Sequence, residues 1–280
     1  MNIRPMSLPS GWYPGSADRT SAQIAEFLGS SREPAERALA GIVPHAGWAF
    51  SGRIALGVIR RLRGEAETVV VVGGHLPPRA GLLAAFEQGY ETPLGDLEAD
   101  LELLEYLRAR IAIQEDRSAD NTVEIQLPFI KHLYPKARAL ALRAAPSAQA
   151  VRLGELLAEA GKSLKRSLVV VGSTDLTHYG PNYGFMPHGL GKEAVRWVRE
   201  VNDRRLVEAL LALDCERALE LAAAEGSACS AGAGAASASF ARRLGVGQGK
   251  LVEYATSYEA HRSDSFVGYA GIIYPGNGGS

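Results

Sequence analysis

The sequence predicts an α/β protein with a central sheet, mostly parallel or mixed, that is flanked by helices. Three largely apolar runs, 38–43, 68–72 and 168–171, each end at a loop that begins with proline or glycine. Strands that are apolar on both faces are typical of sheets covered on both sides. Stretches with helical spacing of apolar residues lie between these runs, and this alternation favours a helix-flanked sheet.

The individual elements follow from local spacing. Residues 1–20 contain Pro5, Pro9 and Pro14 and are expected to be irregular. Apolar residues at intervals of three and four predict helices over 21–28, 54–62, 97–110, 123–134, 148–163, 193–213 and 216–224. A helix of small residues is expected to begin just after Cys229 and to run towards Arg243. Further strands are expected at 139–142, 251–254 and 266–274, the last two of them antiparallel.

The chain 1–280 is expected to form one domain, because it has no fixed-period repeat and no linker rich in proline, glycine or serine. Residues 276–280 are expected to be a disordered tail. The net charge is −1 and no basic stripe is present, so we do not expect a nucleic-acid partner. The apolar runs are too short for a membrane helix of ~20 residues. Two cysteines and the lack of a signal segment predict a soluble cytoplasmic protein of unspecified oligomeric state.

Three of the six histidines, His45, His75 and His178, directly follow the apolar strands. Ligands of open α/β sheets bind beyond the carboxyl ends of the strands, so these side chains are expected to face one crevice. Imidazole serves both as a metal ligand and as a proton-transfer group near neutral pH. Each histidine also has a structural interpretation: His45 could cap the following helix, and His75 could be a turn residue. Asp175, three residues before His178, could orient or charge that ring.

Cys229 precedes a segment of small residues that is expected to be helical. A cysteine at a helix N-terminus has a stabilised thiolate, which favours metal binding or reactivity, whereas a buried small apolar residue is the alternative interpretation. Common hydrolase, zincin and redox signatures such as Gly-x-Ser-x-Gly, His-Glu-x-x-His and Cys-x-x-Cys are absent from the sequence.

Several segments, in this order along the chain, resemble the Memo-like proteins, also known as the B component of the AmmeMemoRadiSam group. The matching segments are Gly11-Trp12-Tyr13-Pro14, Ile42–Trp48 with Ser51-Gly52, Val72-Gly73-Gly74-His75, Tyr90–Leu97, Asn121–Phe129, Ser173–Tyr179 and the residues around Cys229. The sequence departs from the family pattern at Asn121, where many members have histidine, and at Gly73-Gly74 before His75.

The resemblance implies a fold similar to that of the class III extradiol dioxygenases, which are non-haem Fe(II) enzymes. It also implies that His45, His75 and Cys229 are metal ligands and that His178 is an acid/base residue. With Asp175 beside His178, these form the predicted site. Its substrate pocket is expected to be lined by Trp48, Asn121, Glu124 and His261.

The leading functional hypothesis is a metal-dependent oxidoreductase of dioxygenase type. The metal is expected to be iron, with copper or zinc as alternatives, because a thiolate is softer than the carboxylate of the two-His-one-carboxylate triad. A non-catalytic protein that binds metal or peptide in an ancestral enzyme pocket is the second hypothesis, and a zinc-dependent hydrolase is the third. The expected ligand is a small molecule or a peptide.

Overall fold

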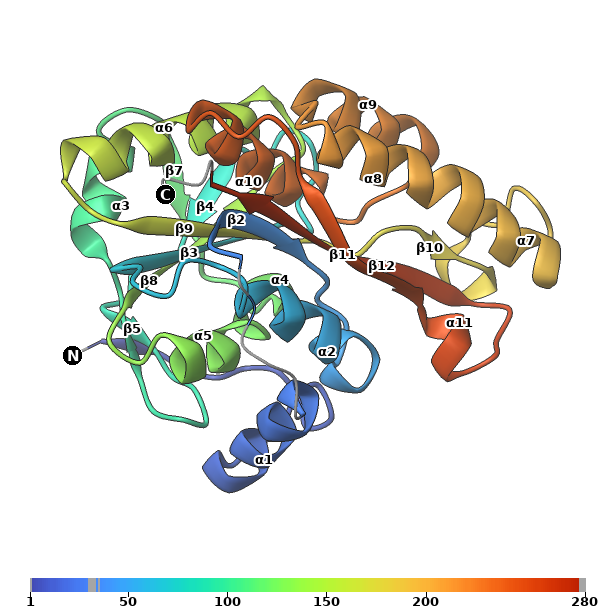
Figure 1. Ribbon diagram of the computed structural model, residues 1–280, viewed down its shortest axis with the longest axis horizontal. Helices are drawn as coiled ribbons and strands as arrows, with labels where there is room; N and C mark the ends of the chain where they lie inside the picture. The colour runs from blue at the N-terminus through green and yellow to red at the C-terminus, as the bar shows by residue number, and fades with distance from the viewer. Residues whose placement is uncertain (1, 30–33, 35, 277–280) are drawn as a thin grey trace.

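The computed structural model describes residues 2–29, 34 and 36–276, and a large mixed sheet forms its centre (Figure 1). The strand order is β10-β12-β2-β9-β3-β8-β4-β7, and β11 pairs with β12 outside this path. The strands of this sheet are β2 Ala38–Val43, β3 Thr68–Gly73, β4 Leu82–Ala84, β7 Ile113–Glu115, β8 Arg138–Ala144, β9 Leu168–Ser173, β10 His178–Tyr179, β11 Lys250–Thr256 and β12 Phe266–Pro275. A small second sheet contains β1 Ile3–Arg4, β5 Gly89–Tyr90 and β6 Leu97–Glu98.

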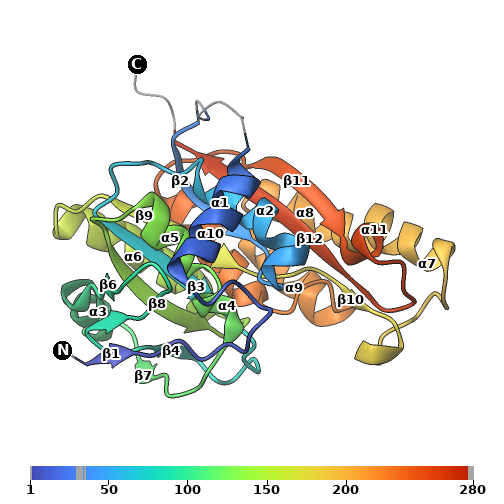
Figure 2. The ribbon, with the colours of Figure 1, turned by 90° about the horizontal axis from the view of Figure 1, so that it is seen from below.

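Helices cover both faces of the large sheet. One face carries α3 Leu101–Arg108, α6 Ala148–Ser163, α8 Asp203–Leu211, α9 Cys215–Glu225 and α10 Ala231–Arg243. The other carries α1 Ala17–Leu28, α2 Trp48–Ile59, α4 Asn121–Glu124 and α5 Leu127–Leu133. Figure 2 shows α1 beside α2 on this second face. Beyond the sheet lie α7 Lys192–Trp197, a π-helical turn Val198–Asn202, the 3₁₀ turn Pro181–Tyr183 and α11 Ser257–Ala260.

The apolar central strands supply the core on both faces, as the sequence predicts. In β3, Val70 and Val72 pack with the helices of the α6 and α10 face, while Val69 and Val71 pack with those of the α2 and α5 face. Side chains of a strand alternate between faces, so a strand apolar at every position can be buried on both. The helix-flanked α/β fold is therefore confirmed.

The direction of the central strands determines the edge of the sheet at which the loops after β2, β3 and β9 lie. The strands β2, β9, β3 and β8 run parallel to one another, whereas β12 is antiparallel to β2. The carboxyl ends of the parallel strands consequently lie at one edge of the sheet. The loops after β2, β3 and β9 all leave the sheet at this edge.

The structure corrects several predicted boundaries. Residues 1–20 are not wholly irregular, because β1 pairs with β5 and α1 begins at Ala17. The helix predicted over 54–62 begins six residues earlier, at Trp48. The region 123–134 contains two helices, and Pro128 lies in the first turn of the second, where its missing N–H is tolerated. Residues 97–98 form β6 rather than helix.

The helix predicted over 193–213 is interrupted by the π-helical turn Val198–Asn202, which separates α7 from α8. The other predictions hold with small shifts at their ends. Helix α6 matches the predicted 148–163, and β11 and β12 are antiparallel. Short strands such as β4 and β7 were not expected, because two or three residues carry too little periodicity to be recognised. The tail predicted to be disordered lies, beyond Gly276, outside the described residues.

Candidate metal centre

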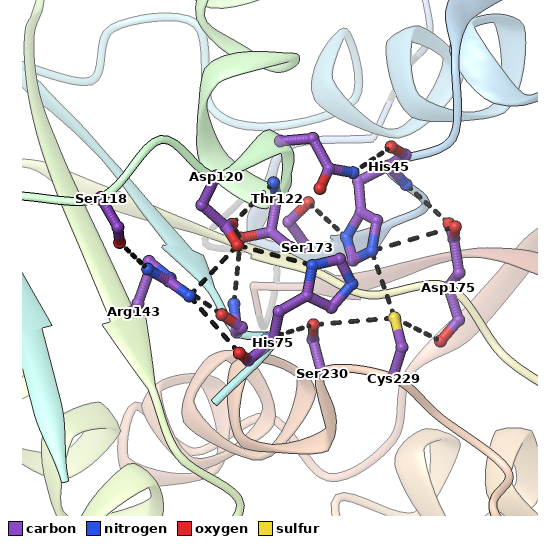
Figure 3. A network of polar contacts seen from close by, with 12 residues as sticks. His45, His75, Ser118, Asp120, Thr122, Arg143, Ser173, Asp175, Cys229 and Ser230 are labelled. Atoms are coloured by element: carbon purple, nitrogen blue, oxygen red, sulfur yellow. Dashed lines mark hydrogen bonds and ion pairs between the residues drawn. The ribbon is translucent and has the colours of Figure 1, made fainter. Parts of the chain in front are cut away.

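Two histidines and one cysteine meet at the carboxyl edge of the sheet (Figure 3). His45 follows β2, His75 follows β3, and Cys229 lies just before α10. Their ligand atoms all lie within 4.8 Å of one another, and Cys229 Sγ is 3.1 Å from His45 Nε2. Metal–ligand bonds of ~2.0–2.3 Å in a tetrahedral site place ligand atoms roughly 3–4 Å apart, so these side chains need to move only slightly to share one ion. The three side chains therefore form a group that could hold a metal ion.

Hydrogen-bond partners orient both imidazole rings. His45 Nδ1 is 3.3 Å from Ser173 Oγ, which directs Nε2 towards Cys229. His75 Nδ1 is 3.5 Å from Asp120 Oδ2 and leaves Nε2 for an ion. The two rings are nearly perpendicular, with centroids 4.8 Å apart. A partner on one ring nitrogen sets the tautomer and direction of the other, as in the outer shell of known metal sites.

The backbone of the His75 turn is unusual. His75 has φ +55°, a left-handed conformation that non-glycine residues seldom adopt. Its N–H donates to Ser230 Oγ at 3.1 Å, and the N–H of Gly74 donates to Thr122 Oγ1 at 3.1 Å. A Cβ at Gly74 would lie 2.5 Å from Ser230 Cβ. Glycine at position 74 thus lets the loop that carries Cys229 approach the loop that carries His75.

The electrostatics favour a thiolate at Cys229. Burial opposes ionisation, but His45, His178 and His75 together hold the pKa of the thiol well below its usual value. Burial lowers the pKa of His45, yet Cys229 and Asp175 outweigh it and raise that pKa overall. The ring of His75 has its pKa raised to about 10, chiefly by its contact with Asp120 and secondly by Cys229.

The sequence suggested that a helix dipole stabilises the Cys229 thiolate, but His45, His178 and His75 are the groups that lower the pKa of this thiol. Helix α10 begins at Ala231 with Ser230 as its N-cap, so Cys229 lies two residues before the first residue of the helix. Two of the three structural interpretations of the site residues are corrected, whereas His75 does lie in a turn. Gly47, not His45, is the N-cap of α2, and Cys229 contacts polar groups rather than packing as a small apolar residue.

His178 and Asp175 stand beside the three ligands. Asp175 Oδ1 accepts a 2.7 Å hydrogen bond from the His45 N–H, and Oδ2 lies 3.8 Å from His178 Nε2. Burial lowers the pKa of His178, but Asp175 and Cys229 outweigh it and raise the pKa to about 9. His178 Nε2 is buried and has no hydrogen-bond partner within the described part of the chain. This nitrogen instead lies within ion-pair distance of the Asp175 carboxylate.

An open cavity of about 680 Å³ lies over the site. The predicted residues His45, His75, Asn121, Asp175, His178 and His261 all line it. Cys229 lies below this lining and contacts His45. Asn121, which replaces the histidine of many family members, donates to the carbonyl of His45 at 3.1 Å. It therefore supports the first ligand loop without supplying a titratable group.

Two predicted pocket residues lie elsewhere. Trp48 is 3% exposed, stacks on Phe129 at 4.0 Å between ring centroids and donates to the Ile125 carbonyl. Trp48 is the first residue of α2, and its side chain points into the core. Glu124 accepts hydrogen bonds from Ser7, Leu8 and Tyr13 and so anchors the N-terminal segment. Neither residue lines the cavity.

Several other residues that line the cavity were not predicted from the sequence. They are aromatic and hydroxyl side chains from helices, strands and loops, namely Trp12, Phe50, Tyr183, Tyr269, Ser257, Ser263 and Ser265. Trp12 belongs to the N-terminal family motif, which was the available signal for its role. The others share no local sequence pattern, because residues of separate elements become neighbours only when the chain folds. The buried Arg143 and Ser230 were missed for the same reason.

The fold and site define a helix-flanked α/β protein with a His-His-Cys group that could hold one metal ion. Within the described residues, no helix combines the length and apolar character needed to cross a membrane. The comparison with known proteins agrees with this class. The model of the Memo-like protein family matches residues 4–273, and the chain belongs to this family.

Archaeal relatives support this assignment. A MEMO1 family protein of Thermococcus onnurineus is 32% identical over 97% of this chain and 99% of its own length. One from Pyrococcus abyssi is 32% identical over 84% of this chain and 86% of its own. A solved structure of an uncharacterized protein from Escherichia coli K12 has the same fold, with a TM-score of 0.50 and 14% identity over 84% of this chain and 99% of that one.

Proposed function

We propose that this protein binds one metal ion through His45, His75 and Cys229 and acts as a non-haem metal-dependent oxidoreductase of dioxygenase type. One observation carries the proposal. The ligand atoms of His45, His75 and Cys229 lie together, and both histidines line a cavity large enough for an organic molecule. Three protein ligands leave coordination positions open, which distinguishes a catalytic site from a closed structural one.

The residues fit a metal on chemical grounds. Two imidazoles and a thiolate form a mixed set that suits iron, copper or zinc better than magnesium or calcium. The pKa of Cys229 is lowered, so the thiol is already disposed to ionise before an ion arrives. The orienting contacts of Ser173 and Asp120 supply the outer shell that such ligands need.

The bound metal would supply the Lewis acidity and redox capacity for reaction of an organic substrate with dioxygen. His178 would move the proton, since it lines the cavity next to the ligand set and its pKa is raised to about 9. Asp175 would stabilise the protonated ring from 3.8 Å. The cavity wall, which includes Trp12 and Tyr183, would orient the substrate and limit the access of water.

A non-catalytic metal-binding protein is the second candidate. Cys229 stands where a dioxygenase triad has a carboxylate, and a thiolate can hold zinc or copper without redox turnover. A zinc-dependent hydrolase with His178 as general base remains the third. In either of these two alternatives, the cavity would bind a small molecule or a peptide.

The deciding experiment is anaerobic metal analysis of the purified protein followed by oxygen-uptake assays with candidate phenolic substrates. One equivalent of iron, together with substrate-dependent oxygen uptake, is the expected result. Tight metal binding without uptake or hydrolysis would favour the binding protein. Failure to bind iron, copper or zinc would refute the metal centre itself.

A further inference from the structure

Arg143 lies near the carboxyl end of β8, directly beside Gly73 of β3 in the sheet register. Its side chain does not line the cavity over the metal site, and the residue is only 6% exposed. A buried arginine needs a partner for each of its donors, because an unsatisfied buried charge is costly. The positions of those partners show what this arginine does.

The guanidinium contacts two sets of acceptors, and Figure 3 shows it beside His75 and Asp120. Towards the metal site, Nε donates to the Gly74 carbonyl at 2.8 Å and Nη2 to the His75 carbonyl at 3.4 Å. Nη2 also lies 3.1 Å from Asp120 Oδ2. On the other side, Nη1 donates to Ser118 Oγ at 2.7 Å and contacts Asp116 at 3.3 Å.

The acceptors on the side of the metal site are the backbone of the His75 turn and the Asp120 carboxylate, and these two groups determine the direction of the His75 ring. The carbonyls of residues 74 and 75 belong to the turn in which His75 adopts its left-handed conformation. Asp120 Oδ2 is the atom that contacts His75 Nδ1 at 3.5 Å. One side chain therefore holds the strained backbone of the ligand and the carboxylate that faces its ring.

We propose that Arg143 is a positioning residue for the metal centre: it holds the His75 turn and the Asp120 carboxylate together so that His75 presents Nε2 to the ion. This inference rests on the proposed metal site. Strained backbone persists at functional sites only where the surroundings over-determine it, and Arg143 is part of those surroundings.

The second set of contacts keeps the guanidinium in place. Arg4 donates to the carbonyls of Asp116 and Ser118 at 2.7 and 2.5 Å, which ties the N-terminal segment to the loop that holds Arg143. Arginine suits this position because its planar fork reaches acceptors in several directions. A lysine would keep the charge but would present three donors from a single atom, and it could not hold both carbonyls and both carboxylates.

The test compares Arg143→Lys with a matched control, Arg166→Lys. Arg166 is also largely buried and pairs with a buried carboxylate, Asp100, at 2.6 Å, but it precedes β9 at the opposite end of that strand from the metal site. The dissociation constant for Co²⁺ is measured by titration of the full-length protein, and the Co²⁺ absorption spectrum reports the ligand geometry. Urea unfolding of each variant gives its stability separately.

We expect Arg143→Lys to raise the Co²⁺ dissociation constant 10- to 100-fold and to shift the visible bands, as outer-shell changes do in other metal sites. Arg166→Lys should lower stability and leave both metal readouts unchanged. Asp120→Asn, which keeps the arginine, should reproduce the loss of affinity and keeps the inference testable if Arg143→Lys does not fold. In that case, an unchanged Co²⁺ affinity and spectrum in Asp120→Asn would refute the inference.

Two outcomes separate the inference from the proposed function. If the unaltered protein binds Co²⁺ and Arg143→Lys binds it with the same affinity and spectrum, Arg143 is a structural residue and the inference is wrong. If the unaltered protein binds no Co²⁺, the metal centre is refuted, and the positioning role falls with it.

Discussion

Replacement of Asp203 by asparagine should change how the stability of the protein depends on pH. Asp203 begins α8 and is completely buried. Its Oδ1 accepts hydrogen bonds from the N–H and hydroxyl of Thr177, next to His178, and its Oδ2 accepts one from the Tyr254 hydroxyl. Burial outweighs these hydrogen bonds and raises the pKa of the carboxyl to about 6, from an ordinary value of 3.8.

The direction of the effect follows from proton linkage. Between pH 3.8 and about 6 the folded protein keeps a proton on Asp203 that the unfolded chain has released. This contribution to stability is complete below the lower value and is lost as the pH rises through the higher one. A gap of roughly two pH units, at ~1.4 kcal/mol each, corresponds to ~3 kcal/mol. Asparagine is neutral at every pH, so Asp203→Asn should remove this part of the pH dependence of the unfolding free energy.

Urea unfolding at several pH values from 4 to 7 measures the difference in unfolding free energy between the unaltered protein and Asp203→Asn. That difference should shift by ~2.4 kcal/mol in favour of the variant as the pH rises from 4 to 7, because a small part of the effect is already lost at pH 4. Asp18→Asn, on the exposed first turn of α1, is the control and should show no comparable trend. A difference that stays constant with pH for Asp203→Asn would refute the reasoning.

Three further predictions concern the metal site. His45→Ala should abolish stoichiometric metal binding while the circular dichroism spectrum stays native, because the ligand follows the strand; unchanged metal content would make this histidine structural. His178→Ala should keep the metal and lose roughly 10²–10⁴-fold of any oxygen-uptake activity, whereas loss of metal would make His178 a ligand. Gly74→Ala should lower stability by ~1–3 kcal/mol and weaken metal binding, since its Cβ would meet Ser230 at 2.5 Å. Gly247→Ala, where a Cβ meets nothing within 4 Å, is its control, and equal behaviour of the two glycine variants in unfolding and metal titrations would contradict the clash.

Much of the fold could be predicted from local sequence. Valines at consecutive positions of 69–72 can be buried on both faces of a strand, and this pattern alone indicated a sheet covered by helices. The positions of His45 and His75 immediately after such strands indicated the correct edge of the sheet. Both signals are local, because they depend only on the period of a strand and on the residue that follows it.

Side-chain direction could not be predicted in the same way. Trp48 and Glu124 occur in family motifs next to site residues, yet one stacks in the core on Phe129 and the other binds the N-terminal segment. Their neighbours in the sequence face the cavity, but successive residues of a helix point in different directions. Proximity along the chain is therefore a weak guide to membership of a site.

The sequence by itself determined the covered sheet and the edge at which its histidines gather. Only the tertiary structure decided that Cys229 reaches His45 across 184 positions and that Arg143 supports the left-handed turn at His75. These contacts depend on how strands are ordered in the sheet and how loops cross its edge. They arise between residues far apart in the chain, for which no local periodicity exists.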